Sequence, residues 1–250
     1  MGIRIGVIGA MDIEIAHLKE RMASEARSAG GAGAAGDASF GETTRAGMTF
    51  YSGTISGTPV VVSMCKVGKV NAAACTQMMC DIFGVTHIVN TGAAGSLDAR
   101  IDIGDFVVST DAVQHDMDVC NFGYEPGQVP GLGTVAFAAD SELRQMAVAA
   151  IEEAAPEVKA FEGRVLSGDQ FVRDQDVKHR IKATFGGLCC EMEGAAIAQV
   201  AHLNDVPFVV VRAISDKADG SDSQLYEEFE RKAAEHSALI VEHMLSRMQG

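Results

Sequence analysis

The stretch PFVVVRAIS, residues 207–215, carries the strongest signal for the fold. Its apolar residues follow one another without alternation, and most of them are β-branched. A strand of this kind is covered on both faces, as in a parallel or mixed sheet packed between helices. Four other runs share this character: IRIGVIG (3–9), PVVVSMC (59–65), THIVNTG (86–92) and DFVVST (105–110). The sequence therefore predicts a largely parallel or mixed central sheet.

Helical patterns lie between and after these runs. Residues 140–156 have apolar side chains on one face, a cap candidate at Asp140 or Ser141, and Pro156 after the end. Residues 68–84 predict a second helix that is closed by Gly84, and residues 225–248 predict a third. The apolar stripe of this third helix consists of Phe229, Ala233, Ile240, Met244 and Met248. Strands that alternate with helices predict a single α/β domain over residues 1–250.

Residues 23–42 differ from the rest because they are rich in Gly, Ala and Ser and have no periodicity. This composition predicts a flexible surface loop, inserted into the domain and not dividing it. The formal charge of −14 argues against binding to nucleic acid, which needs a basic stripe, and favours a small-molecule substrate.

The six cysteines form no CxxC pair, and the histidines are scattered, so zinc-binding spacing is absent. We expect reduced thiols in a cytoplasmic protein. The sequence MGIRIGVIGA does not have the pattern of a signal peptide, and no apolar run reaches the length of a membrane span.

Acidic residues gather where the predicted strands end. Glu14 follows the first strand in GAMDIE, and Asp216 follows the last strand in RAISDKAD, with Arg212 inside that strand. Between them lies NTGAAGSL (90–97), which we interpret as a turn of small residues where a ligand can approach the backbone. Ligands of α/β sheets bind at strand ends, so these residues are candidates for a site.

Two further carboxylates, Glu191 and Glu193, stand at the start of the otherwise small and apolar stretch EMEGAAIA (191–198). A buried charge without a partner costs several kcal/mol, so this pair needs something to bind. Structural explanations stay open. Either glutamate could pair with Arg212, Glu14 could be an ordinary acid of a first helical turn, and Asp216 could be an N-cap. The phosphate-binding patterns GxGxxG and GxxxxGK[ST] do not occur.

Seven motifs together resemble one family. They are IGVIGAMDIEI, KVGKVNAA, NTGAAGSL, HDMDVCNFGYEPGQVPG, SGDQFV, EMEGAAIA and VPFVVVRAISDKAD. Their order is similar to that in the bacterial methylthioadenosine/S-adenosylhomocysteine nucleosidases of the nucleoside phosphorylase superfamily. The resemblance implies a three-layer α/β/α sandwich around a mixed, barrel-like sheet, normally a homodimer. It also implies a hydrolase without metal or cofactor that cleaves the bond between adenine and a 5′-thio-substituted ribose.

The resemblance assigns roles to the candidate residues. Asp216 would be the general acid at adenine N7, supported by Ser215, and Glu14 would be the base that orients water, with Arg212 close by. Glu193 would accept a hydrogen bond from the ribose 2′-hydroxyl. The other residues implied at the sugar and the base are Glu191 and Met192 near the ribose, and Phe171 and Val172 at adenine; without the resemblance, Phe171 would be an ordinary core residue.

The 5′ substituent would lie in an apolar slot. The residues implied from the same chain are Met11, Val67 and Tyr226. The residues implied from the neighbouring subunit are Val119, Phe122, Tyr124 and Pro130. The histidine that starts this segment, His115, is expected to be structural.

Two departures from the family pattern concern Ala93, where a serine or threonine is usual, and Tyr226, where phenylalanine is common. The first leaves the water with one partner fewer, and the second could favour a more polar 5′ group. Three alternatives stay open: a phosphorylase of the same superfamily, a nucleosidase that acts on 6-amino-6-deoxyfutalosine, and a nucleoside-binding protein without catalysis.

Overall fold

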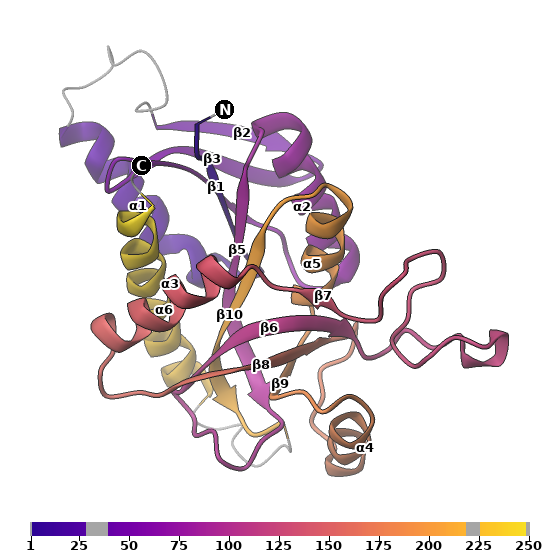
Figure 1. Ribbon diagram of the computed structural model, residues 1–250. Coiled ribbons are helices and arrows are strands. Elements are labelled where there is room, and N and C mark those ends of the chain that lie inside the picture. Colours follow the sequence, from indigo (N-terminus) through magenta and orange to yellow (C-terminus); the bar gives the residue numbers. More distant parts are fainter. Residues whose placement is uncertain (1, 29–39, 219–225, 249–250) are drawn as a thin grey trace.

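The computed structural model describes residues 2–28, 40–218 and 226–248 (Figure 1). For residues 226–231 it describes the backbone but not the side chains. The strands are β1 (Ile5–Gly9), β2 (Gly41–Arg45), β3 (Met48–Ile55), β4 (Thr58–Met64), β5 (His87–Ser96), β6 (Phe106–Gln114), β7 (Phe137–Ala138), β8 (Ala160–Ser167), β9 (Cys189–Glu191) and β10 (Phe208–Asp216). The helices are α1 (Asp12–Ser28), α2 (Lys69–Phe83), α3 (Ser141–Ala154), α4 (Gln175–Phe185), α5 (Gly194–Leu203) and α6 (Tyr226–Arg247), with a short 3-10 helix η1 (Cys120–Phe122).

The strands described form one ten-stranded sheet in the order β10-β6-β8-β9-β5-β1-β4-β3-β2, with β7 beside β6. Strand β5 also pairs with β10, so β10, β6, β8, β9 and β5 close into a ring from which the other strands extend. Parallel pairs such as β1–β5 occur beside antiparallel pairs such as β6–β10. The predicted mixed, barrel-like sheet is confirmed.

Helices cover both faces of this sheet. Helices α1, α3 and α6 lie on one side, and α2 and α5 lie on the other (Figure 1). Successive residues of β1 point to opposite faces: Val7 packs in a cluster with Leu18 and Met244, and Ile8 packs in a second cluster with Met79. This double burial explains the unbroken apolar runs, and the predicted α/β/α sandwich is confirmed.

The ends of the helices follow the signals in the sequence. Helix α2 ends at Gly84, whose φ of 59° is left-handed and suits glycine. Helix α3 is capped by Asp140, whose carboxylate accepts hydrogen bonds from the amides of Glu142 and Leu143. In the stripe predicted for α6, Ile240 and Met244 are fully buried, whereas the side chain of Phe229 lies outside the described residues.

The loop predicted over residues 23–42 is wrong at both ends. Helix α1 continues to Ser28, and β2 begins at Gly41. The carboxylate of Glu25 accepts hydrogen bonds from Thr54 Oγ1 at 2.7 Å and from the amides of Ser56 and Gly57 at 2.7 and 2.9 Å. These contacts join the end of α1 to the turn between β3 and β4, and no local pattern reveals them. Residues 29–39 lie outside the described residues.

The turn predicted over NTGAAGSL is also wrong, because β5 continues to Ser96. Ala93 and Ala94 pair in parallel with Ala213 and Ile214 of β10, and this partner strand keeps the small residues extended. The sequence patterns did not predict β2, β3, β7, β8 or β9. In β3 the buried residues are separated by one or two half-buried ones, and the strand lacks the unbroken apolar run that identified the central strands.

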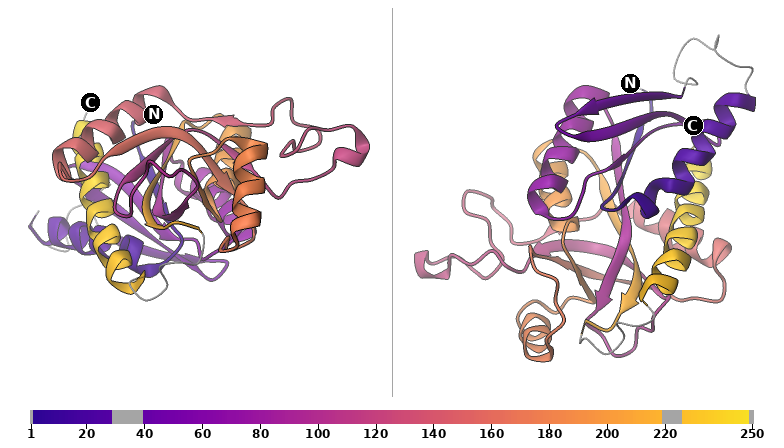
Figure 2. Two further views of the ribbon diagram at one scale, coloured as in Figure 1. Left: turned by 90° about the horizontal axis from the view of Figure 1, so that it is seen from below. Right: turned by 180° about the vertical axis from the view of Figure 1, so that it is seen from behind.

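The segment between β6 and β7, residues 115–136, projects away from the body of the molecule (Figure 2). This segment contains η1, and Phe122, the last residue of η1, is 75% exposed. In the described part of the chain, no helix combines the length and the apolar character that crossing a membrane requires.

Candidate active site

One pocket gathers most of the residues that the sequence singled out. It lies where β5, β9 and β10 end, beside the segments that follow β1, β4 and β8. Its described lining consists of Ala10, Met11, Glu14, Val67, Ala93, Ala94, Gly95, Gln170, Phe171, Val172, Cys190, Glu191, Met192, Glu193, Arg212, Ser215 and Asp216. The side chain of Tyr226 lies outside the described residues. The residues expected to serve a neighbouring subunit, Val119, Phe122, Tyr124 and Pro130, are absent from this lining and belong to the projecting segment.

Sequence reasoning missed five residues of this lining: Ala10, Ala94, Gly95, Gln170 and Cys190. Ala10, Ala94, Gly95 and Gln170 stand inside the quoted motifs, and Cys190 directly precedes EMEGAAIA, so treating every motif residue and its nearest neighbour as a candidate would have found them. Cys190 is the chemically distinct one, and burial, followed by the nearby charge of Asp216, raises the pKa of its thiol to about 12.

Glu14 lies in the first turn of α1 and is only 5% exposed. Its carboxylate accepts hydrogen bonds from the amides of Ala10 at 2.6 Å, Met11 at 3.0 Å and Ala93 at 3.2 Å. Burial raises its pKa, although the charge of Arg212 and these three amides act in the opposite direction. Glu14 is therefore a buried carboxylate with a raised affinity for a proton, which is a property of general bases.

Glycine at position 92 permits this arrangement. A Cβ atom there would lie 2.7 Å from Glu14 Oε1 and 2.2 Å from Arg212 Nη1. Both distances are too short for any side chain, so the backbone of β5 can approach the two charged groups only at a glycine.

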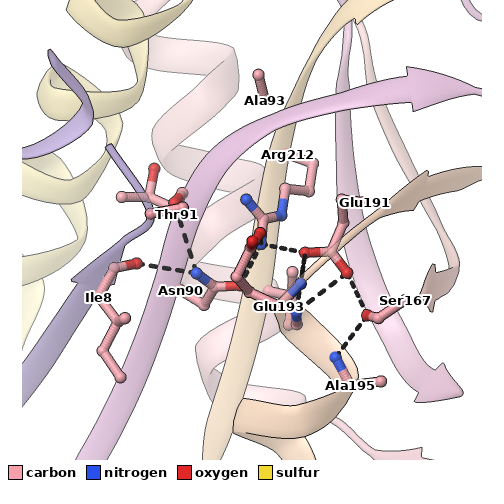
Figure 3. A network of polar contacts seen from close by, with 12 residues as sticks. Ile8, Asn90, Thr91, Ala93, Ser167, Glu191, Glu193, Ala195 and Arg212 are labelled. Carbon is pink, nitrogen blue, oxygen red and sulfur yellow. Dashed lines mark hydrogen bonds and ion pairs between the residues drawn. The ribbon is translucent and has the colours of Figure 1, made fainter. Parts of the chain in front are cut away.

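Glu191 is the centre of a buried polar network (Figure 3). The Ser167 hydroxyl and Arg212 Nη2 both donate to its carboxylate, and the amides of Glu193 and Gly194 donate to it at 2.9 and 2.8 Å. Arg212 is 1% exposed and also donates to Asn90 Oδ1 at 2.6 Å. Both oxygens of Glu191 are thus satisfied by the protein, and the structural pairing with Arg212 that the sequence left open is confirmed for Glu191.

Glu193 is equally buried, at 4% exposure, but has fewer partners. Its Oε1 accepts a hydrogen bond from the amide of Gly68 at 2.8 Å, while its Oε2 lies 3.7 Å from Arg212 Nη2. Burial and then the charge of Glu191 raise the pKa of Glu193 to about 7, against the lowering influence of Arg212 and the Gly68 amide. Since Glu191 takes the close contact with Arg212, Glu193 is the glutamate that can accept a hydrogen bond from a ligand.

Asp216 stands at the last position of β10 and is half-buried. Its carboxylate accepts hydrogen bonds from the Ser215 hydroxyl at 2.9 Å and from the amide of Ala218 at 2.6 Å. The register between β10 and β5 shifts at this point, and a Cβ atom on Gly95 would lie 2.8 Å from Asp216 Oδ1. The strand irregularity and a glycine together leave room for this carboxylate in the pocket.

Phe171 and Val67 provide apolar surface beside these acids. Phe171 is 61% exposed and Val67 is 49% exposed, whereas Val172 is buried. A phenylalanine with this exposure that lines a pocket is not a core residue, so the structural alternative for Phe171 is wrong. Ala93 adds a methyl group and its amide to the pocket but no hydroxyl.

Within residues 2–28, 40–218 and 226–248, no group of three or more His, Cys, Asp and Glu residues is arranged to hold a metal ion. The pocket combines the carboxylates of Glu14 and Asp216, the buried carboxylate of Glu193 and the exposed ring of Phe171. This arrangement can exchange protons with a bound molecule and hold a flat ring and a hydroxyl group.

Comparison with known proteins gives consistent findings. A model of the Phosphorylase superfamily matches residues 4–246. The 5′-methylthioadenosine/S-adenosylhomocysteine nucleosidase of Treponema pallidum is 40% identical over 266 residues, covering 98% of this chain and 93% of the relative. The structure of such a nucleosidase from Colwellia psychrerythraea in complex with adenine has a TM-score of 0.88 and 36% identity, covering 99% of this chain and 96% of that one. Futalosine hydrolase of Helicobacter pylori has a TM-score of 0.83 and 30% identity, covering 98% of each chain.

Proposed function

The chain belongs to the phosphorylase superfamily and, within it, to the 5′-methylthioadenosine/S-adenosylhomocysteine nucleosidases, and we propose that it releases adenine from both of these nucleosides by acid–base hydrolysis. Such an enzyme is an N-glycosyl hydrolase. The observation that carries the proposal is that Glu14, near the start of the chain, and Asp216, near its end, line one pocket. Two carboxylates on separate elements can serve the two ends of a glycosidic bond.

Hydrolysis breaks the bond between ribose C1′ and adenine N9, and the bonding electron pair leaves with the base. We infer that Asp216 gives a proton to adenine N7, which neutralises the negative charge that develops on the base. A water oxygen bonds to C1′, and Glu14 takes the proton that this water loses. The transition state resembles an oxocarbenium ion, so nearby carboxylates also stabilise the positive charge that develops on the sugar.

Glu193 is assigned to the ribose, where its carboxylate accepts a hydrogen bond from the 2′-hydroxyl and Met192 packs on the sugar. Glu191 was expected near the ribose and does line the pocket, but we infer that it does not bind the sugar directly, because its oxygens are already bonded within the protein. Its role in this proposal is to hold Arg212 and the backbone at Glu193 in place. Phe171 stacks on adenine, and the backbone of Val172 bonds to the edge of the base.

The 5′ substituent is assigned to an apolar slot formed by Met11 and Val67, and Tyr226 is kept as a proposed member. The projecting segment supports a homodimer, because Val119, Phe122, Tyr124 and Pro130 lie on it and none of them is in the described lining of the pocket of their own chain. In a symmetric dimer such a segment can complete the pocket of the partner. We also infer a cytoplasmic location, since all six cysteines are unpaired.

Two alternatives are separated by one set of measurements. The resemblance to futalosine hydrolase favours 6-amino-6-deoxyfutalosine as a competing substrate. A phosphorylase would need a basic site for phosphate, whereas the carboxylate of Glu14 lines this pocket and, when ionised, repels an anion. We expect adenine release from methylthioadenosine in phosphate-free buffer, with kcat/KM values for methylthioadenosine and S-adenosylhomocysteine above that for the futalosine derivative. Turnover that requires phosphate would exclude the hydrolase. If no adenine is released at all, the chain would be a nucleoside-binding protein without catalysis.

Replacing Glu193 by glutamine is expected to raise KM and to lower kcat for methylthioadenosine. Glutamine keeps the shape of the side chain and can still accept from the Gly68 amide, but the charge that strengthens the bond to the 2′-hydroxyl is lost. A hydrogen bond to a charged group contributes about 1.5–3 kcal/mol, so kcat/KM should fall by about 10- to 150-fold. The control substrate is 2′-deoxy-methylthioadenosine, on which the variant and the wild type should differ by much less. An equal loss on both substrates would contradict the ribose assignment.

The pH dependence of substrate binding follows from the same residue. Burial raises the pKa of Glu193 from 4.5 to about 7, so the folded protein holds a proton there between these values while the unfolded chain does not. The protonated form of Glu193 therefore contributes to the free energy of unfolding. This contribution is complete below pH 4.5 and is lost as the pH rises through 7. Substrate needs the ionised form, so KM should increase as the pH falls below about 7, and Glu193→Gln should remove this dependence. A wild-type KM that stays constant from pH 8 to 5.5 would refute it.

A further inference from the structure

The amino end of α2 has no capping side chain of its own, because its N-cap residue is Gly68. Two carboxylates from distant parts of the chain take over this task. The amide of Gly68 donates to Glu193 Oε1 at 2.8 Å, and the amide of Lys69 donates to Asp169 Oδ1 at 2.8 Å. The partial positive charge at a helix amino end favours such carboxylates. The start of α2 therefore links Glu193 to the loop that follows β8.

Further contacts join Lys69 and Asp169 through Asp116. We call the residues Lys69, Asp116 and Asp169 the Lys69 cluster. Lys69 Nζ donates to Asp116 Oδ1 at 2.6 Å and to Gln114 Oε1 at 2.9 Å. The amide of Asp169 donates to Asp116 Oδ2 at 2.9 Å. The Lys69 and Asp116 side chains are 16% and 29% exposed, so this ion pair is better shielded from solvent than a surface pair. Burial alone would raise the pKa of Asp116, but the hydrogen bonds from Lys69 and Asp169 lower it.

The cluster joins three segments of the chain. They are the start of α2, the start of the projecting segment at Asp116, and the loop that carries Phe171 and Val172. The second and third segments are also in close contact next to the cluster, because a Cβ atom on Gly168 would lie 2.5 Å from the ring of His115. None of the three cluster residues is part of the described pocket lining, so they do not face the ligand directly.

We propose that the Lys69 cluster is a positioning device that fixes Glu193 and Phe171 relative to each other, so that one nucleoside meets both its ribose partner and its base partner. This inference rests on the proposed function, which places ribose at Glu193 and adenine at Phe171. The cluster acts through the Gly68 amide on one side and through the backbone after Asp169 on the other. The general acid and the general base receive no hydrogen bond from the cluster, so its effect falls on substrate binding more than on the chemical step.

The test compares Lys69→Met with Lys69→Arg, and uses Arg144→Met as the matched control. Arg144 also pairs with a carboxylate, that of Glu162 at 2.6 Å, on a more exposed surface formed by α3 and β8. Lys69→Met should raise KM for methylthioadenosine about tenfold and change kcat by less than about threefold, because the hydrogen bonds that the Lys69 ammonium donates to Asp116 and Gln114 are removed. Lys69→Arg should restore most of the wild-type KM, and Arg144→Met should leave it unchanged. A KM increase below about threefold for Lys69→Met, or a loss confined to thermal stability, overturns the proposal.

A double-mutant cycle with Asp116→Asn tests whether the cluster acts as one unit. If it does, the double variant should raise KM no more than the larger of the two single changes. Multiplication of the two effects would overturn the proposal. The cycle also provides a second route if Lys69→Met alone fails to fold, because Asp116→Asn must then raise KM by itself.

Hydrogen exchange separates a failure of this inference from a failure of the proposed function. In Lys69→Met, the amides of residues 66–72 and 167–172 should exchange faster together, while exchange in Arg144→Met stays at the wild-type level there. This measurement needs no substrate, so it remains valid if methylthioadenosine is not hydrolysed. Faster exchange at only one of the two segments would overturn the proposed link between them.

Discussion

Asp216→Asn is expected to abolish nearly all release of adenine from methylthioadenosine while the variant still binds free adenine. Asparagine has the shape of aspartate: its amide oxygen can accept the hydrogen bond from the Ala218 amide, and its amide nitrogen can donate to the Ser215 hydroxyl oxygen. It cannot deliver a proton to N7, so the electron pair of the broken bond must leave on an unprotonated base. General acid catalysis contributes about 10²- to 10⁴-fold, and kcat should fall by that factor.

Single-turnover kinetics would measure this loss, and calorimetry would measure the affinity for adenine. The control is Asp176→Asn, since Asp176 is an exposed acid in the first turn of α4, outside the pocket. Near-normal turnover in Asp216→Asn would refute the acid role. Loss of both turnover and adenine binding would instead mean that Asp216 mainly shapes the pocket.

Glu14→Gln is expected to lower kcat at least about 10²-fold, because glutamine cannot take a proton from the attacking water. The amide oxygen of glutamine can still accept from Ala10 or Met11, so the fold should persist. Ala93 brings no hydroxyl to the pocket, so under the proposed mechanism Glu14 orients the water with fewer partners and its loss should have a larger effect. KM should change less than kcat, since Glu14 is assigned to the water and not to the nucleoside.

Asp12→Asn provides the control two residues away, with a side chain that is 70% exposed and pairs with Lys19. Its kcat should equal that of the wild type. A second variant, Ala93→Ser, restores the residue usual in the family and should raise kcat of the otherwise wild-type enzyme if the water lacks a partner. Wild-type rates in Glu14→Gln would contradict the assignment of the water.

The pocket also explains why two neighbouring glutamates take different roles. Glu191 ends β9, and the amides at the start of α5 together with Ser167 and Arg212 bond to both of its oxygens. Glu193, two residues later, receives one amide bond from Gly68 and no close bond from Arg212. A buried carboxylate that is only partly bonded is a site where a ligand hydroxyl gains the most.

The sequence alone determined the elements that local physics controls. Unbroken apolar runs identified β1, β4, β5, β6 and β10, because strands buried on both faces need apolar residues at every position. Capping residues such as Asp140 and Gly84 identified helix ends, because they satisfy backbone groups nearby in the chain. The motifs also identified most residues that line the pocket, through the family they resemble.

Only the tertiary structure decided how far β5 extends, which glutamate holds Arg212, and what caps α2. Each of these depends on partners far away in the sequence: β10 for Ala93, Ser167 for Glu191, and Asp169 for Lys69. The hydrogen bond between Ser167 and Glu191 spans 24 positions and that between Lys69 and Asp169 spans 100, so neither leaves a periodic trace in its own segment. Burial and charge compensation act across the folded pocket, so the division of roles between Glu191 and Glu193 emerges only when the chain has closed around Arg212.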